Sequence, residues 1–202
     1  MKRNDGRAAA LYASAMAIYG TIGIFRRLIP LSSGMLACCR GLIGGLVLLA
    51  WMRLRGGRLR LDIPRGKKLL LAVTGGLIGL NWILLFEAYN YTTVGIATLC
   101  YYMQPTLLIL LSPLVFRERL TWLKGLCAAL AFCGMAFISG ITEGAAAQGR
   151  DVIGILLGLG AAALYTTVVI LNKKTPVEDA ASKTVIQLFS AAGVMVPYLL
   201  LT

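Results

Sequence analysis

The most regular pattern in this sequence is a succession of long apolar runs separated by short polar connections. Between Glu87 and Arg117 no charged residue occurs for 29 residues, and between Asp151 and Lys173 none occurs for 21. Lipid cannot satisfy free backbone groups, so runs of this length must be helices. The pattern predicts an all-α, polytopic membrane bundle. Seven runs have about the length needed to cross ~30 Å of hydrocarbon: 8–25, 33–52, 69–89, 94–116, 122–139, 152–171 and 184–202.

Composition agrees with a membrane protein and argues against a soluble enzyme. The 202 residues are 58% hydrophobic and 14% charged, whereas a soluble domain is about 45–50% apolar and about 25% charged. The absence of histidine excludes imidazole bases and HExxH zinc sites. No Walker A pattern occurs, and the five cysteines lie in apolar stretches without CxxC spacing. We therefore expect no catalytic residue, no metal and no cofactor, and we expect the cysteines to be packing residues.

Lysine and arginine are concentrated in alternate connections. There are 20 such cations against 8 acids, and 16 of the 20 precede the first run or follow the second, fourth and sixth. The positive-inside rule then places the N-terminus in the cytoplasm of a multi-pass protein of the inner, or cytoplasmic, membrane. Seven cations lie between residues 53 and 68. We expect this connection to face the lipid bilayer as a topology signal and not to bind nucleic acid.

Three pairs of glycines are spaced four residues apart within the runs: 41 and 45, 75 and 79, and 154 and 158. Such GxxxG patterns let helix backbones approach closely, so packing between helices is the expected role. Gly158, Gly160 and Ala163 also match the GxGxxG/A dinucleotide fingerprint, with Glu178 about 20 residues further on. We reject that reading because the glycines lie inside a charge-free run and not in a solvent-facing turn after a strand.

A shift of the chain by 146 residues aligns Tyr19 with Tyr165, Thr21 with Thr167, Ile24 with Ile170 and Pro30 with Pro176. The register predicts a first five-helix repeat over 1–140 and the start of a second, with two helices, over 141–202. Five is odd, so the second copy would cross the membrane in the opposite sense. Inverted repeats of this kind are typical of secondary transporters.

The stretch from Phe86 to Ser139 is FEAYNYTTVGIATLCYYMQPTLLILLSPLVFRERLTWLKGLCAALAFCGMAFIS, and it resembles the EamA-like family of the drug/metabolite transporter superfamily. The shared features are a short link into an Ala/Thr-rich fourth helix, a mid-helix proline, an acidic residue before Leu-Thr, and a Gly-rich fifth helix. The resemblance implies ten helices in two inverted five-helix halves, cytoplasmic termini and small metabolites as cargo. With seven of those ten helices, the chain is expected to be a fragment or a truncated gene product.

The centre of the fourth run carries the clearest candidates for a substrate cavity. Pro105 cannot donate to the carbonyl of Tyr101, which leaves an acceptor at mid-bilayer depth. At 100° per residue the following share one face, with Gln104 at its edge: Thr98, Tyr101, Tyr102 and Pro105. Cavity lining and bonding to neighbouring helices both remain open for these side chains. The same alternatives apply to Asn81 and Trp82 of the third run, and to Tyr19 and Tyr165.

Arg40 and Glu87 are the clearest ionisable residues inside the runs, and an unpaired charge there costs at least ~2.5 kcal/mol. Arg40 lies about 10 Å from the start of the second run at ~1.5 Å per residue, and Glu87 lies within a turn of the same membrane surface. We expect the two to pair in the outer half of the membrane. The pair could gate the outer mouth, Arg40 could bind a charged substrate group, or the pair could be a structural pin. Glu87 could also simply lie exposed at the interface.

These features predict a secondary transporter that moves small metabolites or amphipathic compounds by alternating access. Its partners would be the lipid bilayer, a small-molecule substrate and either a coupling proton or an exchanged solute, and it could form oligomers. Proton coupling is less strongly supported, because Glu87, the acid within an apolar run, lies near one end of that run. The alternative is a non-transporting truncated remnant or membrane scaffold.

Overall fold

The structure is a computed structural model. It describes residues 6, 9–11, 13–15, 17–18, 21, 29, 31–59, 62–138, 149–174 and 179–201. The chain forms two compact units, Met1–Leu31 and Ser32–Thr202. In the first unit, the described residues between 9 and 18 are helical, as the first apolar run predicts. The hydroxyl of Ser14 there donates to the carbonyl of Ala10 at 2.8 Å. Tyr19 and Pro30 lie outside the described residues.

The second unit is built from helices, and its described residues contain no strand. The helices are α3 (Ser33–Leu54), α4 (Arg65–Tyr91), α5 (Val94–Tyr101), α6 (Gln104–Phe116), α7 (Trp122–Ile138), α8 (Gly149–Lys174) and α9 (Ala180–Leu201). The described residues of the six apolar runs in this unit are therefore helical apart from the turn at Tyr102 and Met103, and the all-α prediction is confirmed. Among the described residues, α3, α4, the α5–α6 stretch and α8 are long and apolar enough to cross a membrane, while α7 is a shorter apolar helix.

Polar side chains fix where several helices begin. Ser32 accepts a hydrogen bond from the backbone N–H of Met35 at 3.3 Å and so caps α3. Thr93 does the same for α5, accepting from Ile96 at 3.2 Å. Each cap satisfies one of the backbone donors that a helix N-terminus leaves without an internal partner. At the other end, α6 ends at Phe116, because the next residue, Arg117, has a left-handed φ of 55° that cannot continue the helix.

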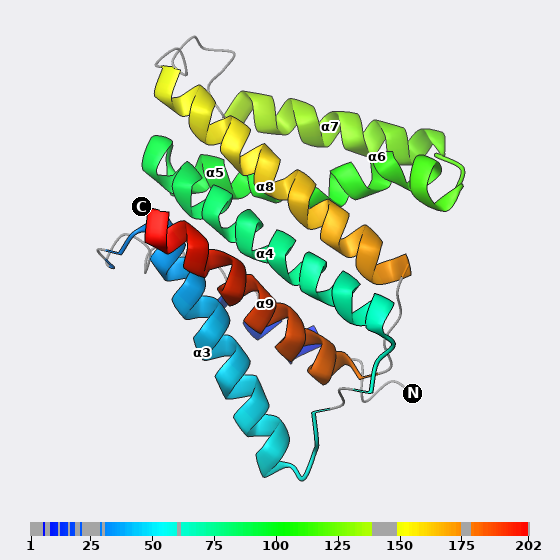
Figure 1. The fold of residues 1–202 in the computed structure, drawn as a ribbon. Coiled ribbons are helices and arrows are strands. Elements are labelled where there is room, and N and C mark those ends of the chain that lie inside the picture. The colour runs from blue at the N-terminus through cyan, green and yellow to red at the C-terminus, as the bar shows by residue number, and fades with distance from the viewer. Residues whose placement is uncertain are drawn as a thin grey trace. The chain divides into compact units, whose positions relative to one another are not determined.

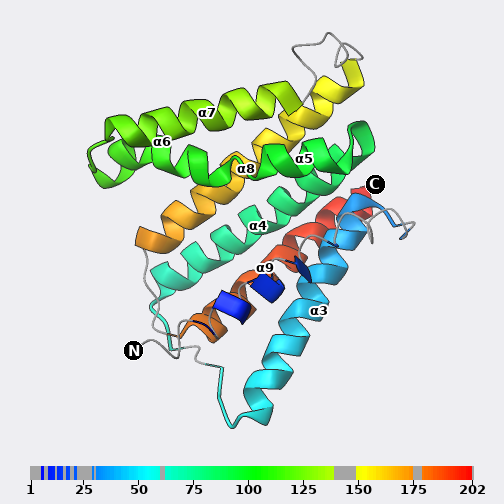
Figure 2. The same cartoon turned by 180° about the vertical axis from the view of Figure 1, so that it is seen from behind.

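Helix α4 lies at the centre of this unit, between α8 on one side and α9 on the other (Figures 1 and 2). Helix α3 packs against α9 and also contacts α4; α5 and α6 pack against α8, and α7 packs against α6. Segments far apart in the sequence therefore lie side by side. A helix from the predicted first repeat is packed between two helices from the predicted second.

Glycines bring α4 into backbone contact with α9. A Cβ placed on Gly75 would lie 2.5 Å from the carbonyl oxygen of Gln187 and 2.6 Å from Cβ of Ser190. On α8, a Cβ placed on Gly158 would lie 2.8 Å from Cβ of Cys100 in α5. No side chain fits at these positions without moving a neighbouring backbone. The packing role predicted for the GxxxG pairs is thus what the structure shows.

We expect Gly75→Ala to lower the free energy of unfolding by about 1–3 kcal/mol, because the methyl group would overlap the backbone of α9. Equilibrium unfolding in mixed detergent micelles measures this change. Gly125→Ala on α7 is the matched control, because nothing lies within 4 Å of a Cβ at that position. Equal effects of the two substitutions would contradict the close approach of α4 to α9.

Candidate functional site

The fourth apolar run is interrupted near its middle. Helix α5 ends at Tyr101, a turn is formed by Tyr102 and Met103, and α6 starts at Gln104. In the turn, the N–H of Met103 donates to the carbonyl of Cys100 at 3.2 Å. This is an i to i−3 hydrogen bond in place of the i to i−4 bond of an α-helix. Pro105 cannot donate to Tyr101, and its ring fits the first turn of a new helix. The sequence predicts a kink here; the structure divides the run into α5 and α6, and the backbone of Tyr102 and Met103 between them stays in the right-handed helical region, with φ of −70° and −68°.

Aromatic and polar side chains surround this interruption. The ring of Tyr101 lies 6.0 Å from that of Tyr165 in α8 and 6.2 Å from that of Tyr102, measured between centroids. The hydroxyl of Thr166, which is fully buried, lies 3.3 Å from the carbonyl oxygen of Gln104 and 2.8 Å from that of Ala162. We name this group the break cluster. Its members are Thr98, Tyr101, Tyr102, Gln104, Tyr165 and Thr166.

The predicted polar face of the fourth run is divided among several neighbours. Thr98 contacts α4, with its hydroxyl 3.3 Å from the hydroxyl of Tyr89. Tyr101 turns to α8, as described above. Tyr102 is 55% exposed and Pro105 is also exposed, so these two lie on the surface of the described unit. The structure therefore brings Tyr101, Tyr102 and Tyr165 together and leaves Pro105 at the edge of the group.

Asn81 and Trp82 are adjacent in α4 but contact different helices. The amide nitrogen of Asn81 donates to the carbonyl of Ala161 in α8. Asn81 is fully buried, and its amide oxygen has no hydrogen-bond partner in the described part of the chain. A buried acceptor of this kind is costly in a protein interior. Trp82 is also buried, and the guanidinium of Arg40 lies over its ring, 4.6 Å from the centroid.

The predicted ion pair between Arg40 and Glu87 is not formed as a contact pair. Glu87 Oε2 instead accepts from the hydroxyl of Ser33 at 2.9 Å and from the amide of Asn90 at 3.1 Å. Ser33 begins α3, whereas Arg40 lies about two turns further along it and is level with Trp82. Among the described residues, one pair of opposite charges lies within 4.0 Å: Lys173 Nζ and Glu118 Oε1 are 3.4 Å apart.

A buried polar link that sequence reasoning missed joins three helices. The amide nitrogen of Gln187 in α9 donates to Thr74 Oγ1 in α4 at 2.7 Å and to Asn172 Oδ1 in α8 at 2.9 Å. Thr74 and Gln187 are both buried. An amide inside an otherwise apolar run was the available signal, because such groups bond across helices in lipid. Tyr89 and Thr166 are further neutral donors inside apolar runs that the sequence analysis did not single out.

Comparison with known proteins gives a consistent answer. A model of the EamA-like transporter family matches residues 6–140. This chain belongs to the EamA-like transporter family. It is also similar to the uncharacterized transporter YxxF of Bacillus subtilis strain 168, with 30% identity over 161 residues, 79% of this chain and 51% of that protein. The chain therefore spans about half the length of that curated relative. No solved structure matches it significantly.

Family membership and the apolar helices together establish a multi-pass membrane protein of a transporter family. The resemblance seen in the sequence is thus confirmed. The roles of individual side chains stay predictions.

The position of Arg40 in this EamA-like protein can be tested by double-mutant cycles. We expect Arg40→Gln and Trp82→Leu to show a coupling free energy of about 0.5–2 kcal/mol in unfolding from mixed micelles, as a desolvated cation–π contact would give. Arg40→Gln and Glu87→Gln should be additive within about 0.5 kcal/mol. A larger coupling free energy between Arg40 and Glu87 than between Arg40 and Trp82 would indicate a direct ion pair instead.

Proposed function

We propose that this protein is a secondary transporter that moves small metabolites or amphipathic compounds by alternating access, with the break cluster lining its cavity. The observation that carries the proposal is the interrupted fourth span. Irregular backbone at membrane depth is tolerated only where protein buries it or where it lines a water-filled cavity. Secondary transporters commonly place their binding sites at such discontinuous helices.

The depth of the interruption supports this role. Helix α5 has 8 residues before the turn and α6 has 13 after it, which correspond to about 12 Å and about 20 Å of helix. The turn therefore lies well inside the bilayer. Tyrosine rings and hydroxyl groups at this depth offer an apolar face together with hydrogen-bonding groups, which suits a small amphipathic solute.

The arrangement of the helices suggests how access could alternate. We assign residues 1–140 and 141–202 to two inverted repeats, and the break cluster has members in both, with Tyr101 in the first and Tyr165 in the second. Helix α4 of the first repeat contacts α9 of the second through glycines, which bring the two backbones close together. Rocking of one repeat against the other about this contact would open the cluster first to one side of the membrane and then to the other.

The side chains of the break cluster are neutral, so the energy source proposed here is an exchanged solute or the solute's own gradient. The nearest acid on α4, Glu87, is bonded to Ser33 and Asn90 near the end of the helix. A coupling proton would need a carboxylate that changes its partners during the cycle. We further propose that the N-terminus is cytoplasmic and the connection 53–68 lies on the same side, because the cations favour that orientation.

Thr98→Cys tests whether the cluster is reached by water, and it needs no knowledge of the substrate. In a background with the five native cysteines replaced by alanine, we expect this thiol to react with a membrane-impermeant methanethiosulfonate, because reaction needs a hydrated thiolate. Leu114→Cys is the control, since Leu114 is 80% exposed on an apolar stretch of α6 and would face lipid. If both thiols resist the reagent, the cluster is not a cavity wall.

Transport itself can be measured with proteoliposomes and a ¹³C-labelled metabolite extract as the probe. We expect at least one metabolite to enter above the level of protein-free vesicles. Tyr101→Leu should slow that entry about tenfold by removing the contact with Tyr165 and the hydroxyl, whereas Leu114→Ala should leave it unchanged. Absence of any movement through the wild-type chain would favour the scaffold function over transport.

A further inference from the structure

The contact between α6 and α8 extends from the break cluster to one end of the helix bundle. It begins where the hydroxyl of Thr166 lies 3.3 Å from the carbonyl oxygen of Gln104. It ends where Lys173, in the last turn of α8, meets Phe116, the last residue of α6. Helix α6 has 13 residues, so this seam is about 20 Å long. We assign the two helices to different repeats, so the seam must open if the cluster is to reach this side of the membrane.

Lys173 crosses the end of the seam through two contacts. Its Nζ lies 3.4 Å from Oε1 of Glu118, in the connection between α6 and α7, and 3.8 Å from the centroid of the Phe116 ring. The lysine and glutamate side chains are 59% and 47% exposed, so their ion pair alone would bias an equilibrium by at most about fivefold. The contact between the ammonium group and the ring adds a comparable factor. Together the two contacts favour the closed seam by about tenfold.

The neighbouring residue, Asn172, joins the end of α8 to α9. Its Oδ1 accepts from the amide of Gln187 at 2.9 Å, and the same amide donates to Thr74 Oγ1 in α4 at 2.7 Å. Gly75, next to Thr74, lies at the close approach of α4 to α9. The hydrogen bond to Asn172 therefore couples α8 to α9 at the contact about which the two repeats are proposed to rock.

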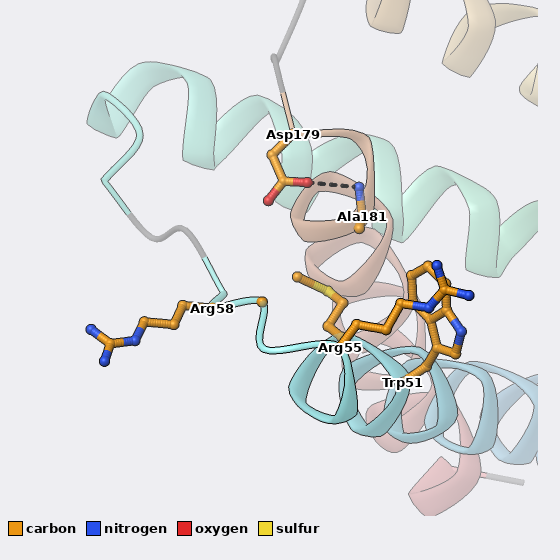
Figure 3. A pocket seen from close by; sticks show the side chains of 7 residues that line it. Trp51, Arg55, Arg58, Asp179 and Ala181 are labelled. Atoms are coloured by element: carbon orange, nitrogen blue, oxygen red, sulfur yellow. Dashed lines mark hydrogen bonds between the residues drawn. The ribbon is translucent and has the colours of Figure 1, made fainter.

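The start of α9 is also held in place. Asp179 accepts from the N–H of Ala181 at 3.1 Å and from the hydroxyl of Ser182 at 2.6 Å, and so caps the helix. Figure 3 shows this cap at the edge of a cavity of about 430 Å³ between the ends of α3 and α9. The half-exposed contacts of Lys173 are therefore the weaker joint of α8, because a buried hydrogen bond is more costly to break than a surface ion pair.

We propose that Lys173 is a gate that closes the break cluster to the membrane surface at which α8 ends and α4 begins. These two helix termini lie at the same end of the bundle (Figures 1 and 2), which is the cytoplasmic end in the orientation proposed above. The gate opens when the lysine leaves Glu118 and Phe116. Its contacts are half exposed, so opening leaves no buried charge without a partner. The inference rests on the proposed transport function, because a gate has a role only if the cluster lines a cavity with alternating access.

Thr98→Cys, in the background without native cysteines, reports the gate through the rate at which an impermeant methanethiosulfonate reacts from each side of membrane vesicles. Lys68→Cys, in the first turn of α4, identifies the side of the gate. We expect the Thr98→Cys thiol to react at least about tenfold more slowly from that side than from the other. K173Q should raise the rate from the gate side about tenfold, because both contacts are lost. K174Q removes the adjacent cation of α8 and should stay within about twofold of the unmodified gate.

Partial variants separate the two contacts. E118Q removes the ion pair and F116L removes the ring, so each should raise the gate-side rate about threefold. K173R keeps both contacts and should change the rate by less than about twofold. Salt at about 0.5 M should raise the rate with Glu118 present and leave that of E118Q unchanged, because salt screens the ion pair. If K173Q does not purify as a monodisperse protein, E118Q/F116L removes the same two contacts.

Several results would overturn the gate. Equal effects of K173Q and K174Q would mean that the reagent responds to local charge, and equal acceleration from both sides in K173Q would mean looser packing. A Thr98→Cys thiol that reacts equally fast from both sides before any gate substitution would also overturn it. If this thiol reacts but K173Q changes nothing, the gate fails and the cavity stands. If the thiol resists the reagent from both sides in every variant, the proposed cavity fails and the gate fails with it.

Discussion

The close approach of α4 to α9, and of α8 to α5, is the constraint on which the rest of residues 32–201 depends. Gly75 and Gly79 face α9 at distances that leave no room for a Cβ, and the α8 glycines face α5 and the link before it in the same way. Between membrane helices there is no hydrophobic driving force, because lipid tails are as apolar as leucine. Dispersion contacts over a close, well-fitted interface must supply the attraction, and glycine is what permits the fit.

The second requirement is that backbone groups exposed by an irregularity find another partner. Pro113 in α6 cannot donate to the carbonyl of Ile109, and the hydroxyl of Ser112 donates to that carbonyl at 2.9 Å. This repair is local and keeps α6 intact. Next to the break in the fourth span, the hydroxyl of Thr166 in α8 lies 3.3 Å from the carbonyl oxygen of Gln104, so the start of α6 contacts α8 through a polar group.

Much of the fold could be predicted from the sequence, because apolar run length and charge-free stretches follow directly from the thickness of the bilayer. The runs at 33–52 and 69–89 became helices with ends shifted by only a few residues. The break at Tyr102 was only half anticipated. Proline indicates that an i to i−4 bond is lost, but whether the helix bends or stops depends on the neighbours that accept or donate across it.

The candidate site was harder to predict, because side-chain partners depend on helix rotation and order in the bundle. Arg40 and Glu87 have complementary charges, yet in the actual packing Arg40 contacts Trp82, whereas Glu87 accepts from Ser33 about two turns away along α3. The hydrogen bonds among Thr74, Asn172 and Gln187 join three helices, and Thr74 and Gln187 are 113 residues apart in the sequence. No pattern within one helix reveals such a contact. Knowledge of which helices are neighbours is needed first.

The central place of α4 also has a consequence for biogenesis. This helix leaves the ribosome about 100 residues before α9, so the glycine surface that α9 covers must first lie against lipid or against the insertion machinery. The contact between α4 and α9 can therefore form only late, after the seventh apolar run has been made. Until then, α4 carries a surface shaped for a helix that does not yet exist, and any factor that delays the release of α9 would hold the chain in that open, half-assembled form.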